Sequence, residues 1–309
     1  MVTGFRRGSS ILGENRMDFE IFRGHTHVRF ILGITMRERV VIKWGGGLIT
    51  QKSVLCTPNL SILDKLAETV SVCCKQGFDV LLVHGAGSFG HLRAKQWKLQ
   101  QGYISEGIFP VSEECSTQLE AVQLVRKEML ELNGYVCDSL RRVGLEPIVH
   151  PPHLWAKNTG IDFLGDLSPL KLQYDGKVHV TFGDVVDVEG DAMFGILSGD
   201  DLVVRLALEL PNVQRLVFAI GGVDGLLRVP PEMAIETDLI EVWSPGIDFE
   251  GTHYSDIDVT GGIGLKAARG AYVAEQGIQV LMVNGGVQER VLGALVGKPV
   301  RGTIVTHKQ

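Results

Sequence analysis

The sequence lacks the features that mark several familiar protein classes. Its five cysteines are odd in number and contain no Cys-x-x-Cys spacing, which indicates neither a zinc site nor a disulfide framework. No apolar run approaches the roughly 20 residues that a membrane-spanning helix requires. The net charge of -6 argues against a broad basic surface for nucleic acid or anionic membranes. We therefore expect a cytoplasmic protein without nucleic-acid or membrane partners.

Glycine, by contrast, is abundant. The chain has 38 glycines in 309 residues, whereas the usual share is about 7%. Its 45% hydrophobic and 21% charged residues are otherwise typical of a folded globular protein. Because glycine permits backbone conformations and close approaches that side chains forbid, the glycine clusters indicate where the backbone meets another group.

The order of apolar and amphipathic segments predicts an α/β fold. Buried strands are expected at residues 40–42, 80–83, 148–149, 178–182, 216–220 and 280–283. Helices are expected over residues 57–77, over residues 112–133 with Gly134 as the stop, and after Gly199, Gly262 and Val287. Strands that alternate with helices favour a mainly parallel central sheet covered on both faces, which is a three-layer αβα sandwich.

The first 36 residues differ from the remainder of the chain. They mix arginines with acidic residues and show no clear hydrophobic periodicity. We predict that residues 1–36 form a disordered appendage. No linker, charge run or repeat divides the rest, so residues 37–309 are predicted to form a single domain.

The glycine clusters follow predicted strands. Gly45, Gly46 and Gly47 come after the first strand, residues 85–90 after the second, and Gly221 after the strand at 216–220. In parallel sheets, ligands bind at the carboxyl ends of the strands. Lys43 lies at the end of the first strand, where a buried amine would need an anion nearby, although a lysine there can also extend to solvent.

Residues 83–91, Val-His-Gly-Ala-Gly-Ser-Phe-Gly-His, permit three interpretations. The glycines match the G-x-G-x-x-G dinucleotide motif, but the required second strand and acidic residue do not follow. Ser88 is placed like the nucleophile of a hydrolase elbow, but Ala86 replaces the first glycine and no later histidine has the expected context. The third interpretation is an anion cradle of backbone N–H groups, with His91 as a further donor. We favour the cradle, which explains glycines and histidine together, although a histidine considered alone is more often solvated.

Two predicted helix starts carry charged residues. Asp200 and Asp201 follow Ser198-Gly199, where they either cap the helix and complement its dipole or, in one case, orient a lysine. Gly262 precedes a helix with Lys266 in its first turn, which is typical of a phosphate site. The chain has no Walker A motif, so a nucleoside triphosphate would be bound without a P-loop.

These segments occur in the order seen in the amino-acid kinase superfamily, which residues 37–305 resemble. The resemblance rests on residues 43–47, 84–91, 183–186, 198–201, 222–225 and 260–266. Within the superfamily the chain is most similar to the isopentenyl phosphate kinases. The most specific mark is His91, which closes an H-G-x-G-x-F-G-H loop, because relatives that phosphorylate carboxylates, carbamate or UMP generally lack this histidine.

The resemblance implies transfer of the γ-phosphoryl group of ATP to isopentenyl phosphate, a step of isoprenoid biosynthesis. Mg²⁺ would accompany the nucleotide, and no residue of the chain is assigned as a metal ligand. Residues 37–195 would form the acceptor-binding half and residues 196–309 the ATP-binding half, in a homodimer. The alternatives are a sister kinase of the same fold acting on another small phosphate or phosphonate, and a non-catalytic nucleotide-binding protein.

The resemblance also implies roles for individual residues. The ATP-binding residues would be Lys43, Gly45, Gly46, Gly47, Gly87, Asp224, Gly262 and Lys266. The phosphate of the acceptor would be held by Ala86, His91 and Gly199. The catalytic residues would be His91, Lys52, Lys43 and Asp200. Lys52 would stabilise charge on the transferring group, and Asp200 would orient the lysines.

Overall fold

The computed structural model describes residues 36–51, 54–109, 115–250 and 262–307, together with two short strands near the amino terminus. Contacts between residues divide the chain into two units, Met1–Met36 and Arg37–Gln309. In the first unit, β1 (Ile11–Leu12) and β2 (Asn15–Arg16) pair antiparallel. The disorder predicted for residues 1–36 otherwise lies outside the described residues. The second unit contains all the other described helices and strands.

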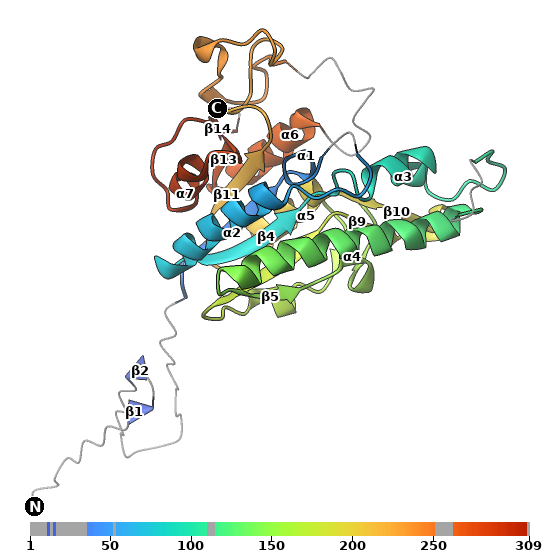
Figure 1. Ribbon diagram of the computed structural model, residues 1–309, viewed down its shortest axis with the longest axis horizontal. Coiled ribbons are helices and arrows are strands. Elements are labelled where there is room, and N and C mark those ends of the chain that lie inside the picture. The colour runs from blue at the N-terminus through green and yellow to red at the C-terminus, as the bar shows by residue number, and fades with distance from the viewer. Residues whose placement is uncertain are drawn as a thin grey trace, which may run out of the picture. The chain divides into compact units, whose positions relative to one another are not determined.

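An eight-stranded sheet forms its middle layer (Figure 1). In spatial order the strands are β12 (Val242–Trp243), β14 (Thr303–Val305), β13 (Gln279–Asn284), β11 (Val213–Ile220), β3 (Arg39–Trp44), β4 (Asp79–His84), β8 (Lys177–Phe182) and β5 (Glu146–Val149). Neighbours from β13 to β5 pair in parallel, whereas β14 runs antiparallel to β13. All six predicted strands lie in this sheet, and its mainly parallel character is confirmed.

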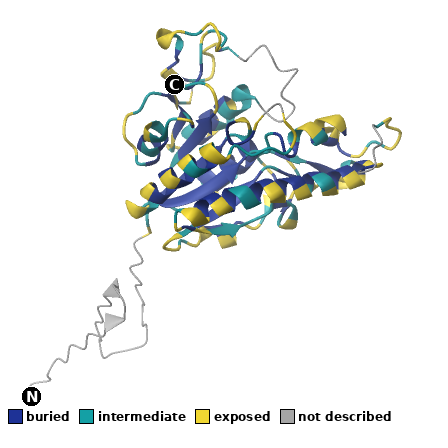
Figure 2. Cartoon of the chain, in the orientation of Figure 1, coloured by how far each residue is buried: buried dark blue, intermediate teal, exposed yellow. Residues whose placement is uncertain are grey.

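Helices cover both faces of the sheet. On one face lie α2 (Leu60–Lys75), α4 (Gln118–Arg142) and α7 (Gln288–Leu295), with α2 in contact with both of the others. On the other face α5 (Gly199–Glu209) packs against α6 (Ile263–Ala274). Figure 2 shows the buried strands between helices whose outer faces are exposed. The predicted three-layer sandwich is therefore confirmed.

Successive side chains of a strand point to opposite faces of the sheet, so the core has two parts, one on each face. In β3, Val40 and Ile42 point toward α2 and α4, whereas Val41 points toward α5 and α6. Each of these three side chains is fully buried. A strand buried on both faces needs apolar residues at successive positions, which is why the central strands appear in the sequence as continuous apolar runs.

The helix predicted over residues 112–133 is misplaced, because α4 begins later and continues past Gly134. It begins at a capping box in which the Thr117 hydroxyl accepts from the Glu120 N–H at 3.2 Å, and Glu120 accepts from the Thr117 N–H at 3.2 Å. A Cβ at Gly134 would meet open space, so this glycine costs the helix only about 1 kcal/mol relative to alanine. The chain turns instead at Gly144, where φ is +82°.

A smaller sheet was not predicted. It has four strands, in the order β10 (Phe194–Leu197), β9 (Asp184–Asp187), β6 (Ala156–Lys157) and β7 (Leu164–Gly165). The hairpin of β9 and β10 follows directly on β8 and carries Val185 and Ile196 to the carboxyl edge of the main sheet. Two further α-helices, α1 (Gly46–Ile49) and α3 (His91–Gln96), are short and follow β3 and β4. No helix among the described residues is long and apolar enough to cross a membrane.

Candidate active site

A cavity of about 440 Å³ opens where β3, β4, β8 and β11 end. This is the edge at which parallel sheets bind ligands. Ten of the residues predicted for the site line it: Lys43, Gly45, Gly46, Gly47, Ala86, Gly87, His91, Gly199, Asp200 and Lys266. Lys52 lies outside the described residues. Gly262 caps α6 beside the cavity lining, and Asp224 lies away from that lining.

The loops after β3 and β4 touch backbone to backbone. A Cβ atom on Gly46 would lie 2.3 Å from the Gly87 nitrogen, and one on Gly85 would lie 2.7 Å from the Gly46 nitrogen. Gly87 also has a φ of +55°, in the left-handed region that favours glycine. The glycines are therefore required for the two loops to approach each other, whatever ligand they bind.

Thr50, at the end of α1, ties the two loops together. Its hydroxyl donates to the Gly46 carbonyl at 2.9 Å and accepts from the Ser88 N–H at 3.0 Å. Thr50 is buried, and a Cβ on Gly87 would lie 2.1 Å from its hydroxyl oxygen. No sequence pattern singled out this threonine, because it has no motif of its own and acts by its place between two loops.

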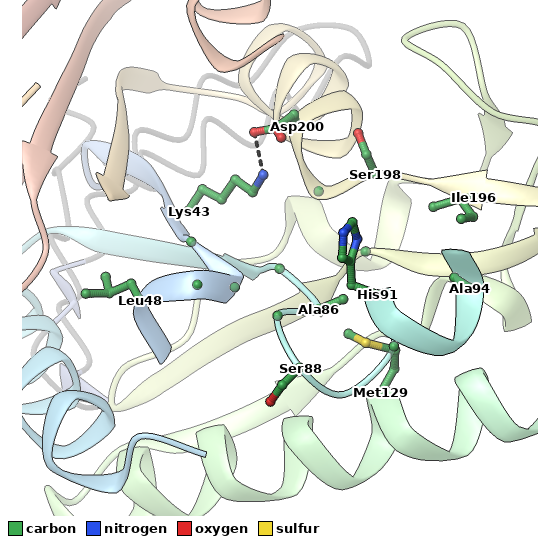
Figure 3. A pocket seen from close by; sticks show the side chains of 18 of the residues that line it. Lys43, Leu48, Ala86, Ser88, His91, Ala94, Met129, Ile196, Ser198 and Asp200 are labelled. Carbon is green, nitrogen blue, oxygen red and sulfur yellow. Dashed lines mark ion pairs between the residues drawn. The ribbon is translucent and has the colours of Figure 1, made fainter. Parts of the chain in front are cut away.

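Lys43, Asp200 and Lys266 form the charged part of the cavity. The Lys43 amine forms an ion pair with Asp200, and the Lys266 amine lies 3.5 Å from the other carboxylate oxygen of Asp200. Figure 3 shows Lys43 extending from its strand toward Asp200. The predicted contact between Asp200 and the two lysines is therefore present. Asp200 thus lies between two lysines that both line the cavity.

Burial alters the acidity of Lys43. Its side chain is 6% exposed, and desolvation lowers the pKa of Lys43 from 10.5 to about 8, despite the opposing attraction of Asp200. The nearby charge of Lys266 acts in the same direction as burial. An anionic ligand bound beside Lys43 would favour the charged form of the amine and would raise this pKa.

The two adjacent aspartates at the start of α5 have different contacts. The Ser198 hydroxyl caps the helix by accepting from the Asp201 N–H at 3.1 Å, and it donates to the Asp201 carboxylate at 2.8 Å. Asp201 also pairs with Arg269 at 2.8 Å. Asp201 is thus the aspartate that belongs to the helix cap, and Asp200 is the one that faces the lysines.

His91 lies between the charged part of the cavity and an apolar part. In Figure 3 its ring stands at the start of α3, with Lys43 and Asp200 on one side and Ile196, Ala94 and Met129 on the other. The apolar part is lined by residues of α3, α4 and the β9–β10 hairpin, namely Leu92, Ala94, Val125, Met129, Val185 and Ile196, and the cavity has further apolar lining residues in Leu48, Ile220, Val223 and Ile263. The cavity can therefore bind a ligand with an anionic end and a hydrocarbon end.

Sequence reasoning missed most of this apolar wall. Val125 and Met129 lie on the apolar stripe of the long helix, where residues are ordinarily core. The apolar residues in and after the glycine loop, Phe89, Tyr103, Ile104, Ile108 and Phe109, do not line the cavity. Phe89 is fully buried, and Phe109 stacks on Trp97 with 5.4 Å between the ring centroids. This apolar wall can be identified only from the fold, which places a helix opposite the glycine loop.

Asp184 is a second carboxylate in the lining. It is buried and accepts from the His153 ring at 2.6 Å, the His153 N–H at 3.2 Å and the Val185 N–H at 2.8 Å. Because these donors occupy both oxygens, Asp184 fixes the start of β9. The Gly183-Asp184 pair belongs to the segments that carry the family resemblance, but its spacing alone gave no role.

Asp224 is placed differently from the other predicted residues. It forms ion pairs with Arg290 and Arg301, and the Asn284 amide donates to it at 3.2 Å. Its side chain is 25% exposed and is not part of the cavity lining. The structure therefore does not bring Asp224 together with the lysines.

The parallel sheet, the cavity at its strand ends and the aspartate between two lysines agree with one class of protein. A model of the amino acid kinase family matches residues 38–284. The chain belongs to the amino acid kinase family.

Within the family, the similarity is to one kind of kinase. Isopentenyl phosphate kinase of Methanothermobacter thermautotrophicus is 28% identical over 274 residues, which cover 87% of this chain and 99% of that relative. Isopentenyl phosphate kinase of Thermoplasma acidophilum is 28% identical over 272 residues, covering 86% and 99%. An isopentenyl phosphate kinase structure superposes with a TM-score of 0.70 at 24% identity, covering 87% of this chain and all of that one, which supports the fold.

Proposed function

We propose that this chain transfers the γ-phosphoryl group of ATP to isopentenyl phosphate, giving isopentenyl diphosphate and ADP. The observation that carries the proposal is the division of one cavity into a charged, glycine-rich part and an apolar part, with His91 between them. A phosphate ester of a short hydrocarbon has an anionic phosphate that suits the charged part and a hydrocarbon chain that suits the apolar part. The similarity to curated isopentenyl phosphate kinases over most of the chain supports the same substrate.

The reaction needs positioning and charge neutralisation more than covalent chemistry. Lys43 and Lys266 supply positive charge for the ATP phosphates, and Asp200 holds both amines toward the cavity. The Gly45–Gly47 and Gly87 backbone would approach the same phosphates. Each of these groups stabilises charge that spreads over the transferring phosphoryl group, and Lys52 is proposed to do so as well.

The acceptor would occupy the remainder of the cavity. His91 would donate to the phosphate of isopentenyl phosphate, with Ala86 and Gly199 contributing backbone N–H groups. The wall that includes Val125, Met129 and Ile196 would hold the isoprenyl chain and exclude water from it. Burial of the chain in this way would favour hydrocarbon esters over nucleotides such as UMP.

Mg²⁺ is proposed to arrive with ATP. The two carboxylates of the lining, Asp184 and Asp200, are already bonded to N–H donors or lysines. The donor set therefore fits a Mg²⁺ ion held mainly by phosphate oxygens, which is a common mode for this ion. Bound there, the ion would neutralise charge on the nucleotide phosphates. A homodimer and a cytoplasmic location remain predictions.

A substrate comparison tests the proposed function. Purified protein with ATP and Mg²⁺ is offered isopentenyl phosphate, dimethylallyl phosphate, UMP, acetylglutamate and fosfomycin in parallel. We expect the highest kcat/KM with isopentenyl phosphate. A better phosphate or phosphonate acceptor would identify a sister kinase, and ATP binding without transfer to any acceptor would identify a nucleotide-binding protein.

A substitution at His91 tests the division of the cavity. His91→Ala is expected to lower kcat/KM for isopentenyl phosphate about a hundredfold, the usual effect of removing one donor to a charged transition state. ATP binding, measured by calorimetry, should survive. Equal loss of ATP binding would show that His91 supports the loop structurally and does not contact the acceptor.

A further inference from the structure

His84 is a buried histidine that the proposed mechanism does not use. It is the last residue of β4 and is fully buried, with its ring stacked on Phe182 at 5.0 Å between centroids. Its carbonyl accepts from the Gly183 N–H at 3.0 Å, and it precedes Gly85 in the chain. Gly85 and Gly183 both line the cavity, so His84 connects two segments of the lining without being part of it.

The His84 ring nitrogens face two oxygens. Nδ1 lies 3.1 Å from the Gly85 carbonyl oxygen, and Nε2 lies 3.3 Å from Oδ1 of Asn133, a buried residue of α4. Nδ2 of Asn133 lies 3.5 Å from Sγ of Cys137, one turn further along the helix. If both oxygens accept from the ring, both ring nitrogens must carry protons, and the ring must be a buried cation.

A neutral ring satisfies the same contacts better. Burial lowers the pKa of His84 to about 4, and a neutral imidazole carries only one N–H. The oxygen and nitrogen of an asparagine amide are assigned from the surrounding hydrogen bonds. With these two atoms of Asn133 exchanged, the amide N–H donates to Nε2, and the Nδ1 proton is left for the Gly85 carbonyl.

Cys137 completes this arrangement. In the exchanged orientation Oδ1 of Asn133 faces Sγ of Cys137. Burial raises the pKa of the Cys137 thiol to about 11, so the thiol keeps its proton and can donate. Each polar group from Cys137 through Asn133 to His84 and Gly85 then has a partner of the opposite kind, as buried polar groups require.

We propose that His84 is a positioning residue: a neutral imidazole protonated on Nδ1, oriented by Asn133 and Cys137, that holds the Gly85 carbonyl and thereby sets the glycine loop. In a planar trans peptide the carbonyl and the following N–H point in opposite directions. Holding the Gly85 oxygen beside the ring therefore turns the Ala86 N–H to the other side of the loop. The kinetic consequence rests on the proposed function, in which Ala86 helps to hold the acceptor phosphate.

Two substitutions of His84 distinguish the role of Nδ1 from that of Nε2. The amide nitrogen of His84→Asn is as many bonds from the backbone as Nδ1, so it can still donate to Gly85. The amide of His84→Gln reaches the position of Nε2 and leaves the Gly85 carbonyl without its donor. We expect His84→Gln to lower kcat/KM for isopentenyl phosphate about tenfold to a hundredfold, the scale of a small misplacement, and His84→Asn to retain most of it.

His179 provides a matched control. It is a buried histidine of the neighbouring strand β8, bonded to the Leu172 carbonyl at 2.9 Å and to His150 at 2.8 Å, and it is not part of the cavity lining. His179→Gln should lower stability without lowering kcat/KM in the folded protein. Equal losses in His84→Asn and His84→Gln, or no loss in either, would overturn the proposal.

Nitrogen NMR of histidine-labelled wild-type protein gives a test that needs no substrate and no variant. At pH 7 we expect His84 to show a protonated Nδ1 and an unprotonated Nε2. A doubly protonated ring, or a proton on Nε2 alone, would overturn the proposal. Failure of the proposed function would appear separately, as wild-type protein that does not phosphorylate isopentenyl phosphate, and would leave the tautomer measurement valid.

Discussion

Asp200 and Asp224 each pair with two cationic side chains, and of these two clusters only the Asp200 cluster belongs to the cavity. Asp200 lies between Lys43 and Lys266 and is 1% exposed. Asp224 lies between Arg290 and Arg301 with its side chain 25% exposed. The family resemblance implies a catalytic role for Asp200 and a role in ATP binding for Asp224.

The difference lies in burial and in the type of cation. The Asp224 cluster is partly exposed, and its Arg301 also lies 3.4 Å from Glu236. Partial burial opposes ionisation of Asp224, yet hydrogen bonds from Arg301 and Asn284 hold its pKa below the ordinary value. The Asp200 cluster contains lysines, and a lysine can lose its proton when buried, whereas an arginine does not. In this protein it is the buried lysine cluster that marks the site.

Removal of the Asp200 charge should have the largest effect. In Asp200→Asn, Lys43 stays buried without its carboxylate, so its pKa should fall further and the amine should lose its proton near neutral pH. We expect kcat/KM to fall at least about a hundredfold and the free energy of unfolding to fall by about 3 kcal/mol. Steady-state kinetics and denaturant titration measure the two.

Asp201→Asn is the control, because Asp201 is the next residue of the same helix and bonds Ser198 and Arg269 instead of the lysines. It should lose stability but keep most of the rate. If the two variants have equal rates, the Asp200 cluster is no more catalytic than its neighbour.

Titration of Lys43 should make kcat/KM depend on pH, and this effect is expected to be intermediate in size. Because burial lowers the pKa of Lys43 to about 8, the amine is charged below that pH and neutral above it. The value of kcat/KM for ATP, which reports groups of the free enzyme, should decline as the pH rises through this range. Lys43→Arg should be slower overall but should lose the decline, because arginine stays charged. An unchanged decline in Lys43→Arg would assign it to another group.

The smallest effect is expected for Asp224→Asn. Loss of a partly exposed cluster should lower the free energy of unfolding by at most about 1 kcal/mol, and the KM for ATP should change little because Asp224 is outside the cavity lining. Kinetics at varied ATP concentration and thermal unfolding measure these quantities. A rise of the ATP KM by about tenfold, or 1.4 kcal/mol of binding free energy, would show that Asp224 contacts the nucleotide and would end the distinction between the two clusters.

The sequence predicts the main sheet well and the walls of the site poorly. The central strands are apolar at successive positions, a signal that comes from burial on both faces, and the segments at 40–42 and 80–83 lie within β3 and β4. The strands of the smaller sheet have two to four residues, too few for any periodicity. The sequence predicts that the helix ends at Gly134. A glycine destabilises a helix by only about 1 kcal/mol, and the other residues of the long helix α4 stabilise it enough for it to continue.

The charged residues divide in a similar way. Contact of Asp200 with Lys43 and Lys266 was anticipated from family resemblance, and the geometry contains it. The arginines that engage Asp224 lie more than sixty positions further along the chain, and no local pattern connects them. Where the family resemblance implies no partner, sequence reasoning therefore misses residues that only the fold brings together.

The clamp made by Thr50 has a consequence for how this protein can change. Because one hydroxyl bonds both glycine loops, the loop proposed to bind ATP and the loop proposed to bind the acceptor phosphate hold each other in position. A substitution that reshapes one loop would disturb recognition of both substrates. The acceptor specificity is therefore easier to change by substitutions at Val125 and Met129 of α4, which leave the two glycine loops unaltered.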